Sequence, residues 1–510
     1  MSLGNAGEHG SEISGKVEKY LVRGYLPTIG IECHVQLATK TKLFSSVDND
    51  ARGKEPNSTV SAVDYALPGT LPVLNKEAII LAARAGKALN SKIANESRFD
   101  RKHYFYPDLP KGYQVSQMYQ PIIIGGFVEL PSGEKVRIHH AHLEEDAGKL
   151  THFNDYSLVD LNRAGTPLIE IVAEPDIHSA ADARAFAEEL HLLMTYSGVT
   201  LGNLFHGNMR FDVNISIAKP GSDKLGSRIE IKNLNSFRSV ERATEYEINR
   251  QIDMLERGEQ ITQETRGWLD DKQKTISQRS KEDAQDYRYM PEPDVPPIIL
   301  TDAEIAKMQE NMPILPSEFR LRFAKLNVDE SVIRVLISDQ KIAERVAEVL
   351  ENSDEKSAKN IANLFASSFN LESSDDKIDS EKNKDFENSK SSDELDLPNA
   401  SSLVELAKMF SNSEISSSAQ KEIFTEMLKN TDEIPRQIAE RKNLIQNSNE
   451  DELGAIIDEV LSSKECGKAV IDFKNGEEKV IGFLVGQVMK KSSGKANPAL
   501  AQKLIKEKLQ

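Results

Sequence analysis

The residues most able to do chemistry lie in a short segment near the start of the chain. In residues 29–37 the odd positions are all apolar, while the even positions are Gly30, Glu32, His34 and Gln36. A period of two is typical of a β-strand with one buried face and one polar face. Glu32 and His34 therefore share a face, and a carboxylate beside an imidazole favours a divalent cation as ligand.

Two later segments, residues 209–217 and 228–232, have the same alternation. Their polar faces carry Arg210, Asp212, Asn214 and Ser216 in the first segment and Arg228, Glu230 and Lys232 in the second. Three such strands predict an antiparallel sheet with one face on the core and one polar face. Polar faces usually meet solvent, but Asp and Asn are poor strand formers, so their presence here favours a ligand-binding face.

The acidic residues on and near these strands predict a metal site. The ligands that we expect are Glu32, His34, Glu230 and one of Glu144 and Glu145. Carboxylate-rich ligand sets favour Mg²⁺ or Mn²⁺ over zinc. We expect the nearby His139 and His140 to take no part.

Basic residues accompany these acids in unusual number: Arg101, Lys102, Lys149, Arg163, Arg210, Lys232, Arg266 and Arg288. Phosphoryl transfer requires carboxylates that hold Mg²⁺ together with several basic side chains. These groups lower its barrier because they position the reactants and neutralise the charge on the transferred phosphoryl group. A P-loop is excluded, because position 143 is Leu where its first Gly is required. Cys33 lies on the apolar face of its strand, so no cysteine nucleophile is predicted there.

Composition indicates a soluble protein, because the chain of 510 residues is 39% hydrophobic and 28% charged. Roughly three domains of about 150 residues fit this length. No membrane span, signal peptide or transit peptide is recognisable, and only two cysteines are present, so we expect a cytoplasmic location. The net charge of -17 argues against a general nucleic-acid coat.

A local basic patch nevertheless lies close to the C-terminus. It consists of Lys490, Lys491, Lys495, Lys503, Lys506 and Lys508, opposed only by Glu507. Phosphate groups would be attracted to it. On charge alone, a solvated lysine-rich helix end explains the patch equally well.

The predicted secondary structure changes along the chain. Alternating strands and helices extend to about residue 297, and a capping box from Thr301 to Glu304 then opens a helical region. Residues 371–400 are polar and poor in aromatic residues, which predicts a disordered insertion. A last helical module is expected from about residue 451 to 510.

Six motifs in order resemble those of the B subunits of the aspartyl/glutamyl-tRNA amidotransferases. They are IGIECHVQL with TKTKLF (29–44), LPGTLPVLN (67–75), FDRKHYFYP (99–107), VDLNRAGTPLIE (159–170), IKNLNSF (231–237) and DYRYMPEP (286–293). The resemblance implies an α+β fold with an antiparallel-sheet cradle, similar to half of a glutamine synthetase, at residues 25–298. It also implies an all-α domain at 299–448 and a small helical tail at 449–510. Residues 1–24 fall outside the resemblance, and we expect them to be a flexible extension.

The activity implied by this resemblance is the amidation of misacylated tRNA by a ligase that forms a carbon–nitrogen bond. ATP and Mg²⁺ phosphorylate the side-chain carboxylate of Glu on tRNA(Gln) or Asp on tRNA(Asn), and ammonia then displaces the phosphate. An amidase partner, the A subunit, would supply the ammonia from glutamine, and a small C subunit would complete a heterotrimer. The tail would bind tRNA, through Lys490, Lys491, Lys495, Lys503 and Lys506.

Site residues follow from the same resemblance. The metal ligands of the family fall on Glu32, His34, Glu145 and Glu230, beside Glu144, and the expected catalytic residues are Lys102, Lys149, Arg210, Asp212 and Lys232. The chain departs from the pattern of the family at two places. The stretch from Ser45 lacks the two cysteine pairs that bind zinc in many members, and His206 stands where an acidic residue is usual. We therefore expect no zinc.

Two alternatives remain open. One is a tRNA-binding scaffold without catalysis, against which the intact acidic residues argue. The other is the related archaeal-type E subunit, whose large extra domain does not fit within this length.

Overall fold

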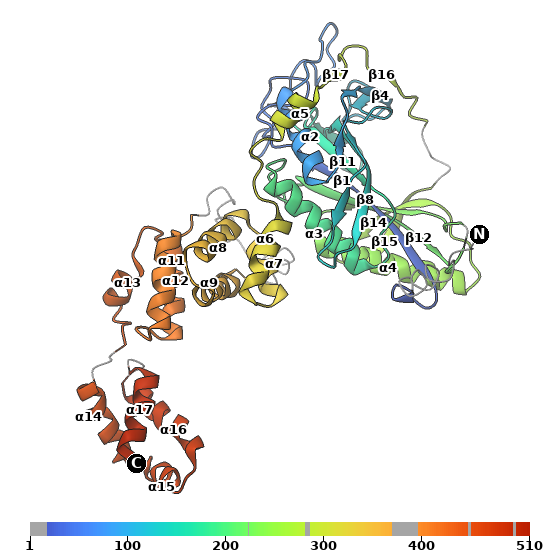
Figure 1. The fold of residues 1–510 in the computed structure, drawn as a ribbon. Coiled ribbons are helices and arrows are strands. Elements are labelled where there is room, and N and C mark those ends of the chain that lie inside the picture. Colours follow the sequence, from blue (N-terminus) through green and yellow to red (C-terminus); the bar gives the residue numbers. More distant parts are fainter. Residues whose placement is uncertain are drawn as a thin grey trace, which may run out of the picture. The chain divides into compact units, whose positions relative to one another are not determined.

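The computed structural model describes residues 18–222, 224–280, 286–369, 396–446, 450–492 and 496–509 (Figure 1). The pattern of contacts between residues divides the chain into two compact units, Met1–Leu315 and Pro316–Gln510. The first unit is mixed α and β, and the second is helical. The predicted α+β class is therefore confirmed.

The first unit is built on one large sheet. Its strands run in the order β15 (Lys274–Ser280), β14 (Glu264–Leu269), β13 (Ile229–Leu234), β12 (Met209–Ala218), β1 (Leu26–Gln36), β11 (Pro167–Ala173), β8 (Lys135–Glu145), β6 (Ile123–Ile124) and β2 (Lys92–Ile93). A further strand, β7 (Phe127–Glu129), pairs with β8. The β13–β14 pair is parallel and the other pairs are antiparallel. The antiparallel arrangement predicted for β1, β12 and β13 is confirmed.

One face of this sheet is apolar and covered by helices. Ile29, Ile31 and Cys33 of β1 are fully buried in the main core, which also contains Phe186 and Val240 from two helices. These helices are α3 (Ala180–Tyr196) and α4 (Phe237–Glu256), and they pack on each other beside α2 (Lys76–Ala88). Serine N-caps, Ser179 and Ser236, accept the first free backbone N–H groups and so define where α3 and α4 begin.

Smaller sheets extend the first unit. A three-stranded sheet, β16 (Met290–Pro291), β4 (Asp100–His103) and β5 (Tyr113–Ser116), lies beside β8, where the Gln114 side chain donates to the Glu145 carbonyl at 2.8 Å. The other pairs are β9 (Lys149–His152) with β10 (Ser157–Asp160) and β17 (Ile298–Ile299) with β3 (Glu96–Ser97). These additions leave the polar face of the main sheet available for a site.

The predicted capping box exists, and it opens α5 (Asp302–Met308). This helix groups with the first unit, because Lys87 of α2 donates to the carbonyl of Gln309, whose side chain donates to Ala83. The division between the units therefore follows Leu315.

The second unit begins with α6 (Pro316–Phe323), η2 (Ala324–Leu326), α7 (Glu330–Ile337), α8 (Gln340–Asn352), α9 (Glu355–Ser368), α11 (Ala400–Ser411), α12 (Ser417–Lys429) and α13 (Pro435–Arg441). The tail helices are α14 (Glu450–Leu461), α15 (Gly467–Lys474), η5 (Glu478–Val480), α16 (Ile481–Lys491) and α17 (Pro498–Leu509), and they share a core of their own. Most of the predicted insertion, residues 371–395, and most of the predicted extension, residues 1–17, lie outside the described residues. Among the described helices none is long and apolar enough to cross a membrane.

Candidate functional site

The strand register of the main sheet brings its polar residues together. Glu32 of β1 lies opposite Asp212 of β12, and His34 lies between Arg210 of β12 and Glu170 of β11. Next along the sheet, His142 of β8 is opposite Glu170, and Glu230 of β13 is opposite Asn214. Five adjacent strands thus contribute to one polar face; alternation predicted three of them, β1, β12 and β13, and the structure adds β11 and β8.

The first group of possible metal ligands is His34, Glu144 and Glu170, whose ligand atoms lie within 4.8 Å of one another. His34 Nε2 lies 3.6 Å from Glu144 and 3.8 Å from Glu170. His142 Nε2 contacts the same two carboxylates, at 3.7 and 3.3 Å. Burial would lower the pKa of His142, but these carboxylates outweigh it and raise the pKa to about 9. The two carboxylates therefore stabilise the protonated form of His142.

The second group is Glu32, Asp212 and Glu230, on β1, β12 and β13. Asn214 donates to Glu32 at 2.9 Å, and Lys232 contacts Glu230 at 2.8 Å and Asp212 at 3.3 Å. Burial, together with Glu170, Asp212 and Glu230, raises the pKa of Glu32. The crowded carboxylate oxygens are ligands that fit a hard divalent cation such as Mg²⁺ or Mn²⁺, and Lys232 pairs with two of these carboxylates in this structure.

A cavity of about 230 Å³ adjoins both groups. Its lining consists of His34, Lys102, Tyr104, Gln114, Glu144, Asp146, Ala147, Leu168, Arg210, Asp212, Lys232 and Asn233. Burial opposes the charge on Lys102 and Lys232, but nearby acids, chiefly Glu144 for the first and Asp212 for the second, raise the pKa of both. Arg210 donates to Asp146 at 3.0 Å. The cavity therefore combines acids with three permanent cations.

Two predicted site residues lie apart from this arrangement. Glu145 is next to Glu144 in β8, so its side chain takes the opposite face, where it accepts from Lys111 and from the backbone N–H of Val115. Lys149 is exposed on the β9–β10 hairpin and does not line the cavity. Of the two residues predicted as alternative metal ligands, Glu144 belongs to a group of possible ligands and Glu145 does not.

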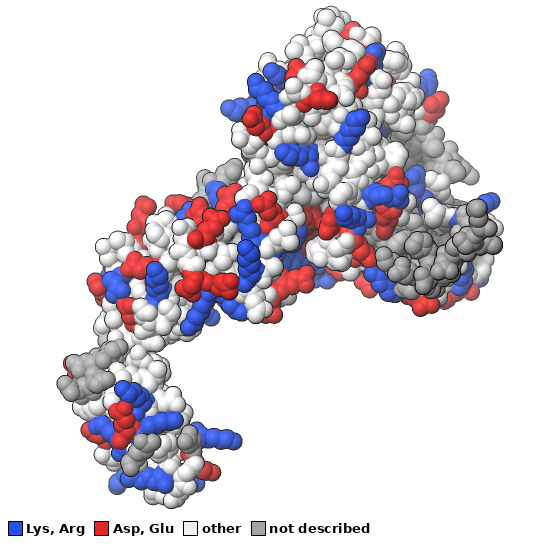
Figure 2. All heavy atoms as spheres, in the orientation of Figure 1, with Lys and Arg blue, Asp and Glu red and all other residues white. Residues whose placement is uncertain are grey.

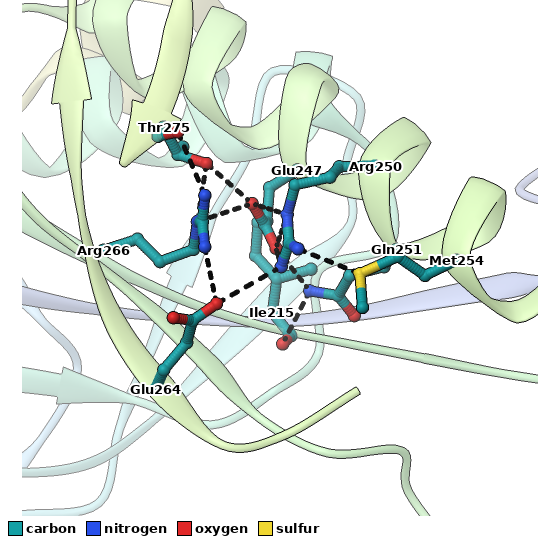
Figure 3. Close-up of polar contacts among 8 residues, drawn as sticks. All are labelled: Ile215, Glu247, Arg250, Gln251, Met254, Glu264, Arg266 and Thr275. Carbon is teal, nitrogen blue, oxygen red and sulfur yellow. Dashed lines mark hydrogen bonds and ion pairs between the residues drawn. The ribbon is translucent and has the colours of Figure 1, made fainter. Parts of the chain in front are cut away.

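Several cations named from the sequence are held in internal ion pairs. Figure 3 shows Arg266 of β14 between Glu264 and Glu247, a fully buried residue of α4. Arg101 makes a bidentate pair with Glu292, at 2.8 and 2.9 Å. These two arginines therefore stabilise the fold, whereas Lys102, Arg210 and Lys232 face the cavity.

Sequence reasoning missed Glu170 and His142 as members of the site. Glu170 is the single polar residue in β11 (PLIEIVA), and its alternation with Ile169 and Ile171 places it on the polar face. His142 lies two residues before Glu144 on the same strand, so strand periodicity could have found it. The departure at His206 lies in an exposed turn before β12, outside the cavity lining.

The tail lysines carry less free charge than their number suggested. Lys490 is exposed, but Lys491 pairs with Glu459 and Lys503 lies 3.8 Å from Glu507. Lys506 is half-buried in α17, and Lys495 lies outside the described residues. The face shown in Figure 2 accordingly carries both basic and acidic side chains over the tail.

The fold and the site define a class of protein: an α+β domain with an acidic sheet face, followed by helical modules. A family model described as "GatB/GatE catalytic domain" matches residues 27–306, and one described as "GatB domain" matches residues 380–509.

Curated relatives named as the B subunit of aspartyl/glutamyl-tRNA(Asn/Gln) amidotransferase agree. The relative from Thermoanaerobacter pseudethanolicus is 45% identical over 490 residues, which cover 95% of this chain and 99% of that protein. The relative from Thermotoga maritima is 42% identical over 496 residues, which cover 95% of this chain and 99% of that protein. The relative from Alkalilimnicola ehrlichii is 44% identical over 494 residues, which cover 94% of this chain and 98% of that protein. The chain belongs to the family of B subunits of the tRNA-dependent amidotransferases, which act in translation.

Proposed function

We propose that this B subunit phosphorylates the side-chain carboxylate of Glu on tRNA(Gln), of Asp on tRNA(Asn), or of both, and then converts it to the amide. A carboxylate oxygen of the aminoacyl group attacks the γ-phosphorus of ATP, and ADP leaves. Ammonia then attacks the acyl carbon, inorganic phosphate leaves, and the nitrogen loses a proton. Activation is necessary because a carboxylate has no good leaving group.

The observation that carries this proposal is the pair of ligand groups beside a cavity that contains Lys102, Arg210 and Lys232. We assign metal binding to His34, Glu144 and Glu170 and to Glu32, Asp212 and Glu230. Bound Mg²⁺ or Mn²⁺ would neutralise phosphate charge and act as a Lewis acid. Glu145 and Lys149 have no place in this assignment, because neither lies in the ligand groups or the cavity lining.

The cationic side chains of the cavity have separable tasks. Lys102 and Lys232 stay protonated at neutral pH, because acids around them raise the pKa of each. They can therefore hold phosphate oxygens or the acceptor carboxylate. Arg210, oriented by Asp146, presents a planar donor that fits either group in bidentate fashion.

Other parts of the chain support the proposal. Cys33 and Cys466 are both buried, so neither is available as a nucleophile that would release ammonia from glutamine. We infer that an amidase, the A subunit, supplies ammonia and that a small C subunit completes a heterotrimer. We assign catalysis to residues 25–298, with a cradle like half of a glutamine synthetase, and tRNA binding to the tail at 449–510, with the helical residues 299–448 between them along the chain.

The test is amidation by the assembled complex with ATP, Mg²⁺, ammonium and Glu-tRNA(Gln), with Asp-tRNA(Asn) in parallel. Loss of an outer-shell partner of a metal typically costs about 10- to 100-fold in activity or metal affinity, so Glu32→Ala and Glu170→Gln should lose at least that much. Binding of Mn²⁺, measured by electron paramagnetic resonance, should fall with activity. Glu129→Gln, at the exposed end of β7, is the matched control. Full activity of Glu32→Ala would refute the metal assignment.

A further inference from the structure

Five of the chain's 12 tyrosines form one continuous row. The ring centroids lie 6.2 Å apart for Tyr106 and Tyr104, 6.0 Å for Tyr104 and Tyr287, 6.2 Å for Tyr287 and Tyr289, and 6.3 Å for Tyr289 and Tyr119. Each pair meets edge to face, which is a favourable geometry for aromatic rings. The row joins three segments that are distant in sequence.

This tyrosine row begins at the candidate site and ends in solvent. Tyr104 lines the cavity, and the ammonium of Lys102 lies 4.9 Å from the ring centroid of Tyr287. Tyr106 is 50% exposed and Tyr119 is 66% exposed. A row built only to pack would bury its ends, whereas here one exposed end, Tyr106, adjoins the cavity-lining Tyr104 and the other, Tyr119, is open to solvent, which indicates a contact surface.

The row has rigid supports. The backbone N–H of His103 in β4 donates to the carbonyl of Tyr287 at 2.8 Å, which fixes the segment before β16. The buried carboxylate of Asp100 accepts from the backbone N–H groups of Met118 and Tyr119, at 2.9 and 3.1 Å. Rings held in place lose little conformational entropy on binding, which favours affinity.

A cation accompanies the rings. Arg288 lies between Tyr287 and Tyr289 in the chain, is exposed, and makes no ion pair with any residue that the structure describes. Aromatic rings with an arginine are the chemistry that binds unpaired nucleotides, because bases stack on the rings and phosphates pair with the cation. Tyrosine and arginine are also common at protein interfaces, but Tyr104 lines the cavity that takes the tRNA-borne substrate, which favours nucleotides as the ligand.

We propose that the tyrosine row and Arg288 bind the unpaired nucleotides at the 3′ end of the tRNA. This inference rests on the proposed function, in which the aminoacyl group at that 3′ end enters the cavity. An aminoacyl group is short, so the terminal nucleotide must lie at the mouth of the cavity, where the exposed ring of Tyr106 stands beside Tyr104. Stacking tolerates any base, which suits a 3′ end that does not identify the amino acid.

The experiment is a binding cycle with the assembled complex, without ATP. Affinity is measured for Glu-tRNA(Gln) and for the same tRNA truncated by its unpaired 3′ nucleotides. Tyr106→Ala and Tyr119→Ala should each weaken binding of the full-length tRNA by about tenfold and leave the truncated tRNA unaffected. Tyr106→Phe should retain wild-type affinity, because the ring remains. Tyr156→Ala, a 54% exposed tyrosine between β9 and β10, is the matched control.

Arg288→Gln should reduce the slope of log affinity against log salt by about one for the full-length tRNA. Equal losses with both RNAs, or no loss, would overturn the proposal. Failure of the alanine variants to assemble would also overturn it, since the row would then contact a protein.

The binding measurement is independent of the proposed reaction, because binding needs no phosphoryl transfer. Failure of the proposed function would instead appear as a wild-type complex that binds both RNAs but forms no ADP.

Discussion

Replacing Glu247 by Ala should destabilise the first unit strongly, without any role for this residue in catalysis. Glu247 is fully buried in α4, and its carboxylate accepts from Arg250 at 2.6 Å and from Thr275 at 3.1 Å (Figure 3). Arg266 Nε lies 3.6 Å from the same carboxylate. Removal of the carboxylate leaves two arginines of α4 and β14 with one remaining acid, Glu264.

The magnitude follows from this arrangement. Loss of one member of a buried ion pair typically destabilises a protein by about 3–5 kcal/mol. Glu264 still contacts Arg266 at 2.5 Å and Arg250 at 3.8 Å, so part of the charge stays compensated. We therefore expect a loss near the lower end, about 3 kcal/mol.

Urea unfolding followed by tryptophan fluorescence measures this effect directly, because Trp268 of β14 is the single tryptophan of the chain. A loss of about 3 kcal/mol should lower the urea midpoint by roughly 1 M. Glu259→Gln removes a carboxylate from an exposed pair with Arg257 and should leave the midpoint unchanged. Both variants remove a carboxylate, one from a buried cluster and the other from an exposed pair.

An unchanged midpoint for Glu247→Ala would refute the reasoning, because a buried carboxylate between two arginines would then contribute nothing to stability. A folded Glu247→Ala variant with normal stability but no amidation would show that the Glu247 cluster acts in catalysis. The second result would return Arg266 to the group of candidate catalytic cations.

Two further predictions concern the tail and a tight turn. Lys490→Glu should weaken tRNA binding more than Lys491→Glu, because Lys491 already pairs with Glu459, and added salt should diminish the difference; equal effects in filter binding would contradict this. Gly165→Ala should cost at least about 2 kcal/mol in the same urea assay, since φ is +80° and a Cβ would lie 2.5 Å from Asp64. Gly53→Ala, with φ of +64° and open space around it, should cost only about 1 kcal/mol; an equal loss at both glycines would refute the role of Asp64.

Local periodicity was sufficient to predict the polar sheet face. Alternation in β1, β12 and β13 places Glu32, Asp212 and Glu230 together, and their side chains form one of the two ligand groups. Such predictions succeed because side-chain direction in a strand depends only on parity. The same rule places the side chains of Glu144 and Glu145 on opposite faces of β8. The prediction from the sequence accepted either residue as a ligand because it did not apply this rule.

Contacts between distant segments could not be predicted in this way. Arg266 and Glu247 are separated by the α4–β14 connection, and nothing local shows that they form an ion pair instead of a phosphate site. Lys149 belongs to a hairpin whose position relative to the cavity depends on tertiary packing. The tail lysines likewise meet acids of α14 only after the helices pack.

The two cysteines of the chain are both buried, and each lies in a different unit: Cys33 in the centre of the main sheet and Cys466 in the core of the tail. Burial also raises the pKa of Cys33, so its thiolate is scarce while the sheet is intact. Each unit therefore contains a natural chemical reporter. The order in which the two thiols become modified by an alkylating reagent records which unit opens first.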